Sequence, residues 1–264
     1  MKYELELDDT CLSILKRYRH PRIRTPFAEL DGEDTPSSPA GLEYGKAYEV
    51  YGKSNEGKTA ILLRIIASLT LAKQYGGDEK RAIYVDFDGT FTPFRLLEVV
   101  EKEIQAYLRR EYGGERGRGE GRTGADISNE VVAALDRVTY YSCADVDEAV
   151  DVLQQIQRSV DAKRSPLLLL DGISQFFWAC HARVTMAGQP VNQGSSGYSR
   201  LLGCVKDILR SNWCAVVYTR APVLQWEDTN GAVGKRKTPL GSSWSYLPHR
   251  SVNAPSLLAG FDSM

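Results

Sequence analysis

The stretch AYEVYGKSNEGKT, residues 47–59, decides the fold that this sequence predicts. Its first part, residues 47–51, has the composition of a short β-strand, and residues 58–75 have the apolar spacing of a helix. Between them, residues 52–59 match the pattern G-x-x-x-x-G-K-[ST] of a phosphate-binding loop. Glycines at both ends let the backbone wrap the phosphates, so that backbone N–H groups and the helix N-terminus face the anionic oxygens. The pattern also sits where its mechanism requires, directly after a strand and at the start of a helix.

This loop supplies the candidate nucleotide-binding residues. We expect Lys58 to reach the β- and γ-phosphates and the Thr59 hydroxyl to hold Mg²⁺, so the expected cofactors are ATP and Mg²⁺. The remaining candidates are Gly52, Asn55 and Gly57. Glu56 is an unusual charge for such a loop; the position contributes mostly backbone, but the carboxylate would weaken affinity if it faced the ligand.

Further along the chain, strand-like runs alternate with helical stretches. The expected strands are 82–87, 137–142, 166–172 and 213–219, and the expected helices are 93–111, 145–162 and 197–211. Such alternation predicts an α/β fold whose mostly parallel central sheet is covered by helices on both faces.

A second element of a nucleotide site follows the apolar run PLLLLDG, residues 166–172. This run ends in Asp171, and a carboxylate at the end of a buried strand is the usual partner of a phosphate-binding loop. We therefore expect Asp171 to hold Mg²⁺, directly or through water, together with Thr59.

The sequence divides into two expected parts. Residues 1–45 read as an N-terminal arm and linker, and residues 46–264 as the ATP-binding core. Within the core, residues 112–126 are rich in glycine, arginine and glutamate and predict a loop insertion. Two interpretations of this loop stay open, a solvated flexible loop and an Arg-Gly contact with nucleic acid.

Composition excludes several protein classes. The net charge is −1, so nucleic-acid binding would need a local basic patch. Five cysteines without a CxxC pair favour neither a disulfide scaffold nor a zinc site and indicate a reducing compartment. The charged start predicts no signal peptide, and no apolar run approaches the ~20 residues of a membrane span. We expect an intracellular protein without a membrane partner.

The stretch AIYVDFDGTFTPFRL, residues 82–96, resembles a segment of the RecA-like recombinases. In this resemblance Asp86 takes the place of an aspartate of the family, and Asp88 takes the place of the glutamate that activates the attacking water. AVVYTR, residues 215–220, is similar to the strand that senses the γ-phosphate, and puts Arg220 at the sensor position. The resemblance extends over about residues 45–250. Its individual motifs match loosely, except for the phosphate loop and DGTF.

The resemblance implies a RecA-like P-loop core and, among short eukaryotic paralogues, a role in homologous-recombination DNA repair in the nucleus. It further implies an ATP-binding adaptor in a hetero-oligomer with other recombinase paralogues. Asp88 is one methylene shorter than glutamate, about 1.5 Å, and misplacement of about 1 Å can cost ~10²-fold in rate. With Arg220 in place of a neutral sensor, we expect weak or absent ATPase activity. Whether the chain is an enzyme stays open.

DNA contact is expected from two loops, residues 180–197 and 221–242. The second loop carries the candidates Lys235, Arg236 and Lys237, and Trp226 or Trp244 would offer a stacking face. A plain solvated basic loop is the competing interpretation, because three charges make a modest patch.

Two alternatives for the whole chain remain. One is an active DNA-dependent ATPase that exchanges strands itself. The other is a P-loop small-molecule kinase, which would need an arginine-bearing lid over the phosphates; the acid-rich segment 112–126 makes a poor one.

Overall fold

A computed structural model describes residues 22–35, 39–112, 124–177, 196–221, 244 and 246–259. Within these residues six strands form one sheet in the order β3-β2-β4-β5-β1-β6, and every strand pair in it is parallel. The strands are β1 (Ala47–Tyr51), β2 (Ala82–Asp86), β3 (Val138–Ser142), β4 (Leu167–Asp171), β5 (Ala215–Arg220) and β6 (Arg250–Asn253). The prediction of an α/β fold with a mostly parallel sheet is confirmed.

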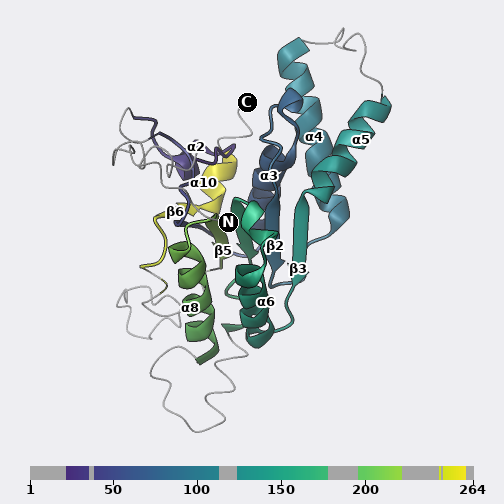
Figure 1. The fold of residues 1–264 in the computed structure, drawn as a ribbon. Helices are drawn as coiled ribbons and strands as arrows, with labels where there is room; N and C mark the ends of the chain where they lie inside the picture. The colour runs from purple at the N-terminus through teal and green to yellow at the C-terminus, as the bar shows by residue number, and fades with distance from the viewer. Residues whose placement is uncertain are drawn as a thin grey trace, which may run out of the picture.

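Helices cover both faces of this sheet (Figure 1). One face packs against α3, α4, α5 and α10, and the other packs against α6 and α8. The helices are α2 (Ala28–Asp31), α3 (Lys58–Thr70), α4 (Pro93–Tyr112), α5 (Gly124–Asp136), α6 (Val146–Arg158), α8 (Ser196–Arg210) and α10 (Ala254–Ala259), with 3₁₀ turns η1 (Lys73–Tyr75) and η2 (Ala162–Arg164). None of the helices within the described residues is long and apolar enough to cross a membrane.

The central strands are buried on both faces, which explains their continuous apolar runs. All five residues of β4 are buried, with Leu167 and Leu169 in the core on the α3 side and Leu168 and Leu170 in the core on the α6 side. Because the strands are parallel, their carboxyl ends meet at one edge of the sheet, where ligands of open α/β sheets bind. The polar Asp171 at the end of β4 therefore lies at that edge.

Residues 22–45, which we expected in an N-terminal arm, pack onto the core where they are described. Ile23, Phe27, Leu30 and Leu42 are buried in the same hydrophobic cluster as α3. The Arg250 guanidinium donates to the Leu30 carbonyl oxygen at 2.7 Å and so joins this segment to β6. Residues 1–21 lie outside the described residues.

Several helices differ in length from the expected ones. The expected helix 58–75 ends as α3 at Thr70, since the next residue, Leu71, has extended backbone (ψ 146°). The expected helix 145–162 is α6, and Asp145 caps it, its side chain accepting the N–H groups of Asp147 and Glu148. Both ends of the expected loop 112–126 are helical, because α4 runs to Tyr112 and α5 begins at Gly124; residues 113–123 lie outside the described residues.

Candidate functional site

The loop between β1 and α3 has the backbone that its glycines permit. Gly57 caps α3 with φ +78°, and Asn55 has φ +63°, both in the left-handed region that favours glycine or asparagine. A Cβ atom at Gly57 would also collide with the side chain of Leu258 from α10. The loop conformation and its packing against α10 together require glycine at this position.

Glu56 turns back onto its own loop. Its Oε2 accepts the backbone N–H of Lys53 at 2.6 Å, and a Cβ atom at Gly52 would lie 2.8 Å from the same oxygen. The carboxylate thus occupies one backbone N–H of the phosphate-binding loop. A phosphate oxygen that used the Lys53 N–H would have to displace it.

Lys58 also makes a contact within the loop, donating from Nζ to the Lys53 carbonyl oxygen at 2.7 Å. Partial burial lowers the pKa of Lys58, although the carboxylates of Asp171, Glu56 and Asp88 oppose the shift. An ammonium group that is partly desolvated gains from an anionic ligand, so this lysine is suited to a phosphate.

The structure brings Thr59 and Asp171 together across 112 residues of sequence. Thr59 Oγ1 donates to Asp171 Oδ2 at 2.7 Å. Two more hydroxyls reach the same buried carboxylate, Tyr84 OH donating to Oδ2 at 2.6 Å and Thr219 Oγ1 donating to Oδ1 at 2.5 Å. Asp171 is only 1% exposed, so these three donors replace the water that a carboxylate needs.

Asp86 organises the loop that follows β2. It pairs in register with Asp171, is fully buried, and accepts the backbone N–H groups of Asp88, Gly89 and Phe91 at 3.0–3.2 Å. These bonds fix the turn that carries Asp88. Asp86 is therefore a structural residue of the site, a role that its place two residues before DGTF did not reveal.

Asp88 lies beside the strand-end carboxylate. A Cβ atom at Gly172 would lie 3.2 Å from Asp88 Oδ2, so Asp88 contacts the residue that follows Asp171. Burial, with the charge of Asp171, raises the pKa of Asp88, and hydrogen bonds from Thr90 counteract the rise. Thr90 Oγ1 donates to Asp88 Oδ1 at 2.6 Å. A carboxylate with a raised pKa is a stronger base, but one of its oxygens is already engaged.

Arg220 lies on the other side of the sheet from this cluster. Successive side chains of a strand point to opposite faces; Thr219 reaches Asp171, whereas Arg220 donates from Nε to Glu49 Oε1 of β1 at 2.5 Å. This ion pair is largely buried, the Glu49 side chain being 7% exposed. The sensor role of Arg220 stays a prediction, and the structure assigns it a partner that the sequence did not suggest.

The residues of this edge fit ATP and Mg²⁺. Bound Mg²⁺ would neutralise and orient the phosphates, and Thr59 and Asp171 are the oxygen ligands placed to hold it. Gly52, Asn55, Gly57 and Lys58 form the loop that would receive the phosphates. The fit rests on the convergence of hydroxyl and carboxylate oxygens at the start of α3.

Sequence reasoning missed two residues of this cluster, Tyr84 and Thr219. Both lie inside buried strands and contact Asp171 only through strand pairing. The sequence offered only a weak signal, a hydroxyl residue two positions before the end of β2 and one position before the end of β5.

The DNA-binding candidates lie mostly outside the described residues. These are Lys235, Arg236, Lys237, Trp226, residues 180–195 of the first loop and residues 222–242 of the second. Trp244 is described, and its ring is 3% exposed and packs edge-on against Tyr218 with a centroid distance of 6.0 Å. The expectation that Trp244 offers a stacking face is wrong, because the indole belongs to the core.

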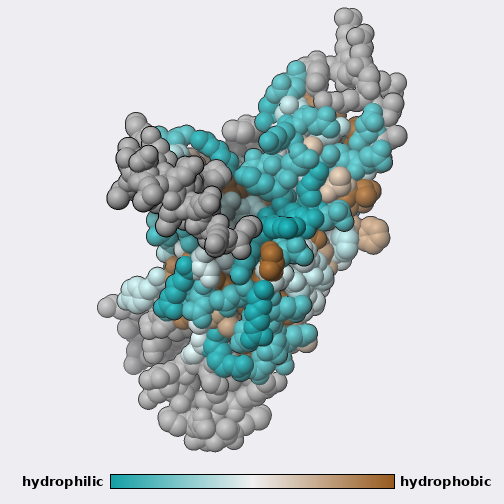
Figure 2. All heavy atoms as spheres, viewed as in Figure 1, coloured by the Kyte–Doolittle hydropathy of each residue, from teal (hydrophilic) through white to brown (hydrophobic). Residues whose placement is uncertain are grey.

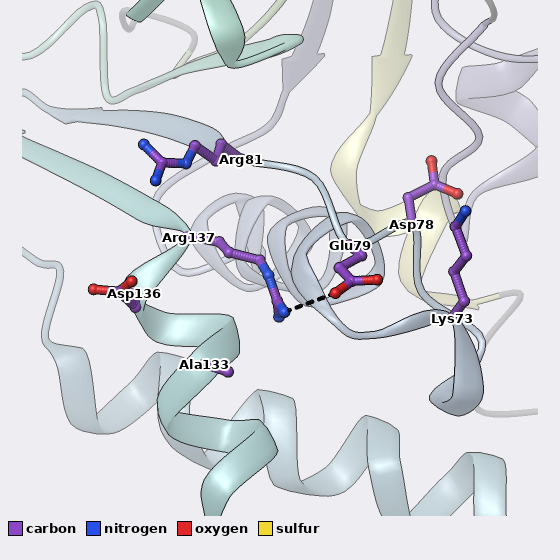
Figure 3. A pocket seen from close by; sticks show the side chains of 7 residues that line it. All are labelled: Lys73, Asp78, Glu79, Arg81, Ala133, Asp136 and Arg137. Atoms are coloured by element: carbon purple, nitrogen blue, oxygen red, sulfur yellow. Dashed lines mark hydrogen bonds and ion pairs between the residues drawn. The ribbon is translucent and has the colours of Figure 1, made fainter. Parts of the chain in front are cut away.

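A hollow of about 450 Å³ opens where β2 and β3 begin, at the sheet edge opposite to the phosphate loop (Figure 3). Its lining mixes both signs of charge: Lys73, Asp78, Glu79, Arg81, Ala133, Asp136 and Arg137. Arg137 is bound to Glu79 and Glu130 at 3.3 Å each. The hollow is separate from the nucleotide site, and its opposed charges give it no strong preference for an anion.

Comparison with known proteins adds an independent line of evidence. A family model described as Rad51 matches residues 23–106. The chain is 24% identical over 223 residues to the DNA repair protein RAD51 of Mycosarcoma maydis, covering 83% of this chain and 56% of the relative. It is 25% identical over 221 residues to the DNA repair protein rhp51 of Schizosaccharomyces pombe, covering 83% and 52%.

The RAD51 homolog 1 of Arabidopsis thaliana is 24% identical over 221 residues, again covering 83% of this chain and 56% of the relative. The chain spans about half the length of the curated relatives it matches. The Rad51 match includes the phosphate loop, β2 and the segment with Asp86 and Asp88. The chain is thus similar to RAD51 proteins over much of its length, and its parallel α/β fold agrees with a RecA-like core.

Proposed function

We propose that this protein is an ATP-binding recombinase paralogue that acts as an adaptor in homologous-recombination DNA repair in the nucleus. In this proposal it resembles the second X-ray-repair cross-complementing protein among the short eukaryotic paralogues, and it assists the main recombinase within a heteromeric complex. ATP and Mg²⁺ are its cofactors, held by the phosphate loop, Thr59 and Asp171. The matched relatives are all named as DNA repair proteins, which supports the proposed role in DNA repair.

One observation carries the proposal: Thr59 contacts Asp171 beside the phosphate loop, while the residue at the base position is the shorter Asp88. Thr59, Asp171 and the phosphate loop are assembled. Asp88, at the position of the water-activating residue, is one methylene shorter than glutamate and is tied to Thr90 at 2.6 Å. A site of this kind retains nucleotide better than it hydrolyses it, which suits a subunit whose nucleotide stabilises an interface.

DNA contact belongs to the proposal as well, through loops 180–197 and 221–242 with Lys235, Arg236 and Lys237. The phosphate backbone of single-stranded or branched DNA is the ligand that such a basic segment would take. The relatives' role in DNA repair supports this contact.

An exposed apolar surface supports a protein partner. β3 is the edge strand of the described sheet, and Tyr140 on it is 42% exposed. Phe94 of α4 and Val132 of α5 are 77% and 66% exposed. Figure 2 shows hydrophobic side chains gathered over α4 and α5 next to β3. We propose that another recombinase paralogue covers this surface, defined by Phe94, Val132 and Tyr140.

The test is affinity capture of the tagged protein from cells, followed by mass spectrometry. We expect recovery of other recombinase paralogues, and at least about tenfold less with Val132→Asp, since an unpaired carboxylate in a buried interface costs more than 1.4 kcal/mol. Val160→Asp is the matched control, because Val160 is similarly exposed, at 72%, and follows α6.

Two results would count against the proposal. Recovery of metabolic enzymes alone would favour the small-molecule kinase, and self-filaments of the purified protein on DNA would favour the active recombinase. If Val132→Asp and Val160→Asp reduced the recovery of paralogues equally, the surface defined by Phe94, Val132 and Tyr140 would not be the partner-binding surface.

A further inference from the structure

We infer that Tyr84 is a positioning residue for the Asp171 carboxylate. Its hydroxyl determines how much a divalent metal strengthens nucleotide binding at this site. This inference rests on the proposed nucleotide binding. Tyr84 OH donates to Asp171 Oδ2 at 2.6 Å. The same oxygen accepts Thr59 Oγ1 at 2.7 Å. Two hydroxyl donors therefore share one carboxylate oxygen.

The two donors differ in what they can do when a metal enters. Thr59 is at the start of α3, and its oxygen has to turn toward the metal if it is to ligate it. Tyr84 is in the middle of β2, is fully buried, and pairs in register with Leu169. The Tyr84 hydroxyl stays in place when the Thr59 bond is given up, so it remains to hold Oδ2.

Packing keeps the Tyr84 ring from moving. Phe91 lies against it with a centroid distance of 4.9 Å, and Tyr140 stacks on Phe91 at 4.7 Å. Phe91 is itself fixed, because its backbone N–H donates to Asp86 Oδ2 at 3.0 Å. The loop that carries Asp88 thus packs, through Phe91, on the tyrosine that holds Asp171.

The opposite oxygen of Asp171 has its own donor. Thr219 Oγ1 binds Oδ1 at 2.5 Å and accepts the N–H of Gly172 at 2.7 Å. With Thr219 alone, the carboxylate would be held at one oxygen and free to rotate about it. Groups that orient a metal-ligating carboxylate in this way typically contribute 10–100-fold to metal affinity.

The experiment compares Tyr84→Phe with Tyr48→Phe in the full chain. Tyr48 is the matched control: it is also buried in a strand on the α3 side, and its hydroxyl accepts the backbone N–H of Glu43 at 2.8 Å. The Kd of a fluorescent ATP analogue is measured with saturating Mg²⁺ and with EDTA. The Kd in EDTA divided by the Kd with Mg²⁺ is the factor by which the metal strengthens nucleotide binding.

For Tyr84→Phe we expect this ratio to fall by about 10-fold or more, with the Kd in EDTA unchanged within about twofold. For Tyr48→Phe we expect both values to match the wild type, although each variant loses one hydrogen bond of a buried tyrosine. If Tyr84→Phe does not fold, as judged by circular dichroism, Tyr84→Met removes the same hydroxyl and carries the same expectation.

An unchanged ratio in a folded Tyr84 variant overturns the inference while leaving nucleotide binding intact. An equal fall in the Tyr84 and Tyr48 variants also overturns it, because the effect would then be one of general packing. A wild-type protein that binds no nucleotide contradicts the proposed function instead.

Discussion

At the scale of single residues, the proposed account gives nucleotide binding and nucleotide hydrolysis to different side chains. Asp171, the proposed metal ligand, accepts hydrogen bonds from three hydroxyl donors. Asp88 is half-buried, and burial raises its pKa, so its charge costs free energy that other contacts must offset. Its neighbour Thr90 occupies one of its oxygens. These features favour a site that retains ATP and turns it over slowly.

The environment of Asp88 predicts that replacing its carboxyl group raises Tm, by an amount that depends on pH. Because its pKa is raised in the folded chain, folded Asp88 keeps a proton over a pH range in which the unfolded chain has lost it. The stability that this provides is present at low pH and is lost as the pH rises through the folded pKa. Asp88→Asn, whose amide oxygen can still accept from Thr90, should therefore raise Tm at pH 7, with the gain vanishing as the pH falls toward about 3.9.

Thermal unfolding from pH 4 to pH 8 in EDTA measures this difference. Asp34→Asn is the control, since the hydrogen bond from Arg24 lowers the pKa of the exposed Asp34 carboxyl and its loss should not raise Tm. A Tm for Asp88→Asn that stays below the wild type at pH 7 would contradict this account of the Asp88 environment.

At the scale of elements, pattern and composition located the buried strands and the long helices well. β1, β2, β4 and β5 are apolar runs next to turn residues, and α6 has an aspartate cap and a regular apolar face. The sequence did not reveal β6, because its four residues RSVN are mostly polar and become a strand only by pairing with β1. It did not reveal α10 either, a helix of six residues with proline at its second position.

The start of α5 was predicted wrongly for a different reason. Its sequence GADISNEVVAALD follows directly on the glycine-rich segment, and the expected loop extended into its first turn. Contacts with α4 and β3 hold this helix, through buried Val131 and Ala134. Tertiary packing thus decided the boundary between loop and helix.

One arginine joins three of these elements and gives a test at this scale. Arg137, just before β3, donates to the carbonyl oxygen of Thr70 at the end of α3 at 2.8 Å and to Glu130 of α5 at 3.3 Å. Arg137→Ala would leave Glu130, which is 10% exposed, without that cation. We expect a loss of about 1–3 kcal/mol in the free energy of unfolding.

Urea unfolding measures this loss, with an unchanged dependence of free energy on urea concentration. Arg164→Ala is the matched control, because Arg164 pairs with Asp161 at the surface and its side chain is 72% exposed. Its effect should stay below about 0.5 kcal/mol. Equal losses for the two arginines would show that Arg137 does not join the elements as described.

At the scale of the whole molecule, the parallel sheet gathers distant residues at one edge. Thr59 and Asp171 were predicted from glycine spacing and a strand end, and Asp88 was predicted from the resemblance of residues 82–96 to a recombinase segment. Tyr84 and Thr219 were not, since their contacts with Asp171 arise from strand register. The pairing of Arg220 with Glu49 has the same origin, as it depends on β5 lying beside β1.

The central claim is that the chain binds ATP at its phosphate loop and turns it over slowly. Its most direct test is to isolate the protein after incubation with radiolabelled ATP and Mg²⁺ and to identify the retained nucleotide. Lys58→Ala is the negative control. Lys73→Ala, in the hollow remote from the phosphate loop, is the matched control. We predict retention mainly as ATP by the wild type and Lys73→Ala, and at least about 10-fold weaker binding by Lys58→Ala, since a hydrogen bond to a charged group contributes about 1.5–3 kcal/mol. Absence of retained nucleotide, or its rapid conversion to ADP by the wild type, would contradict the account.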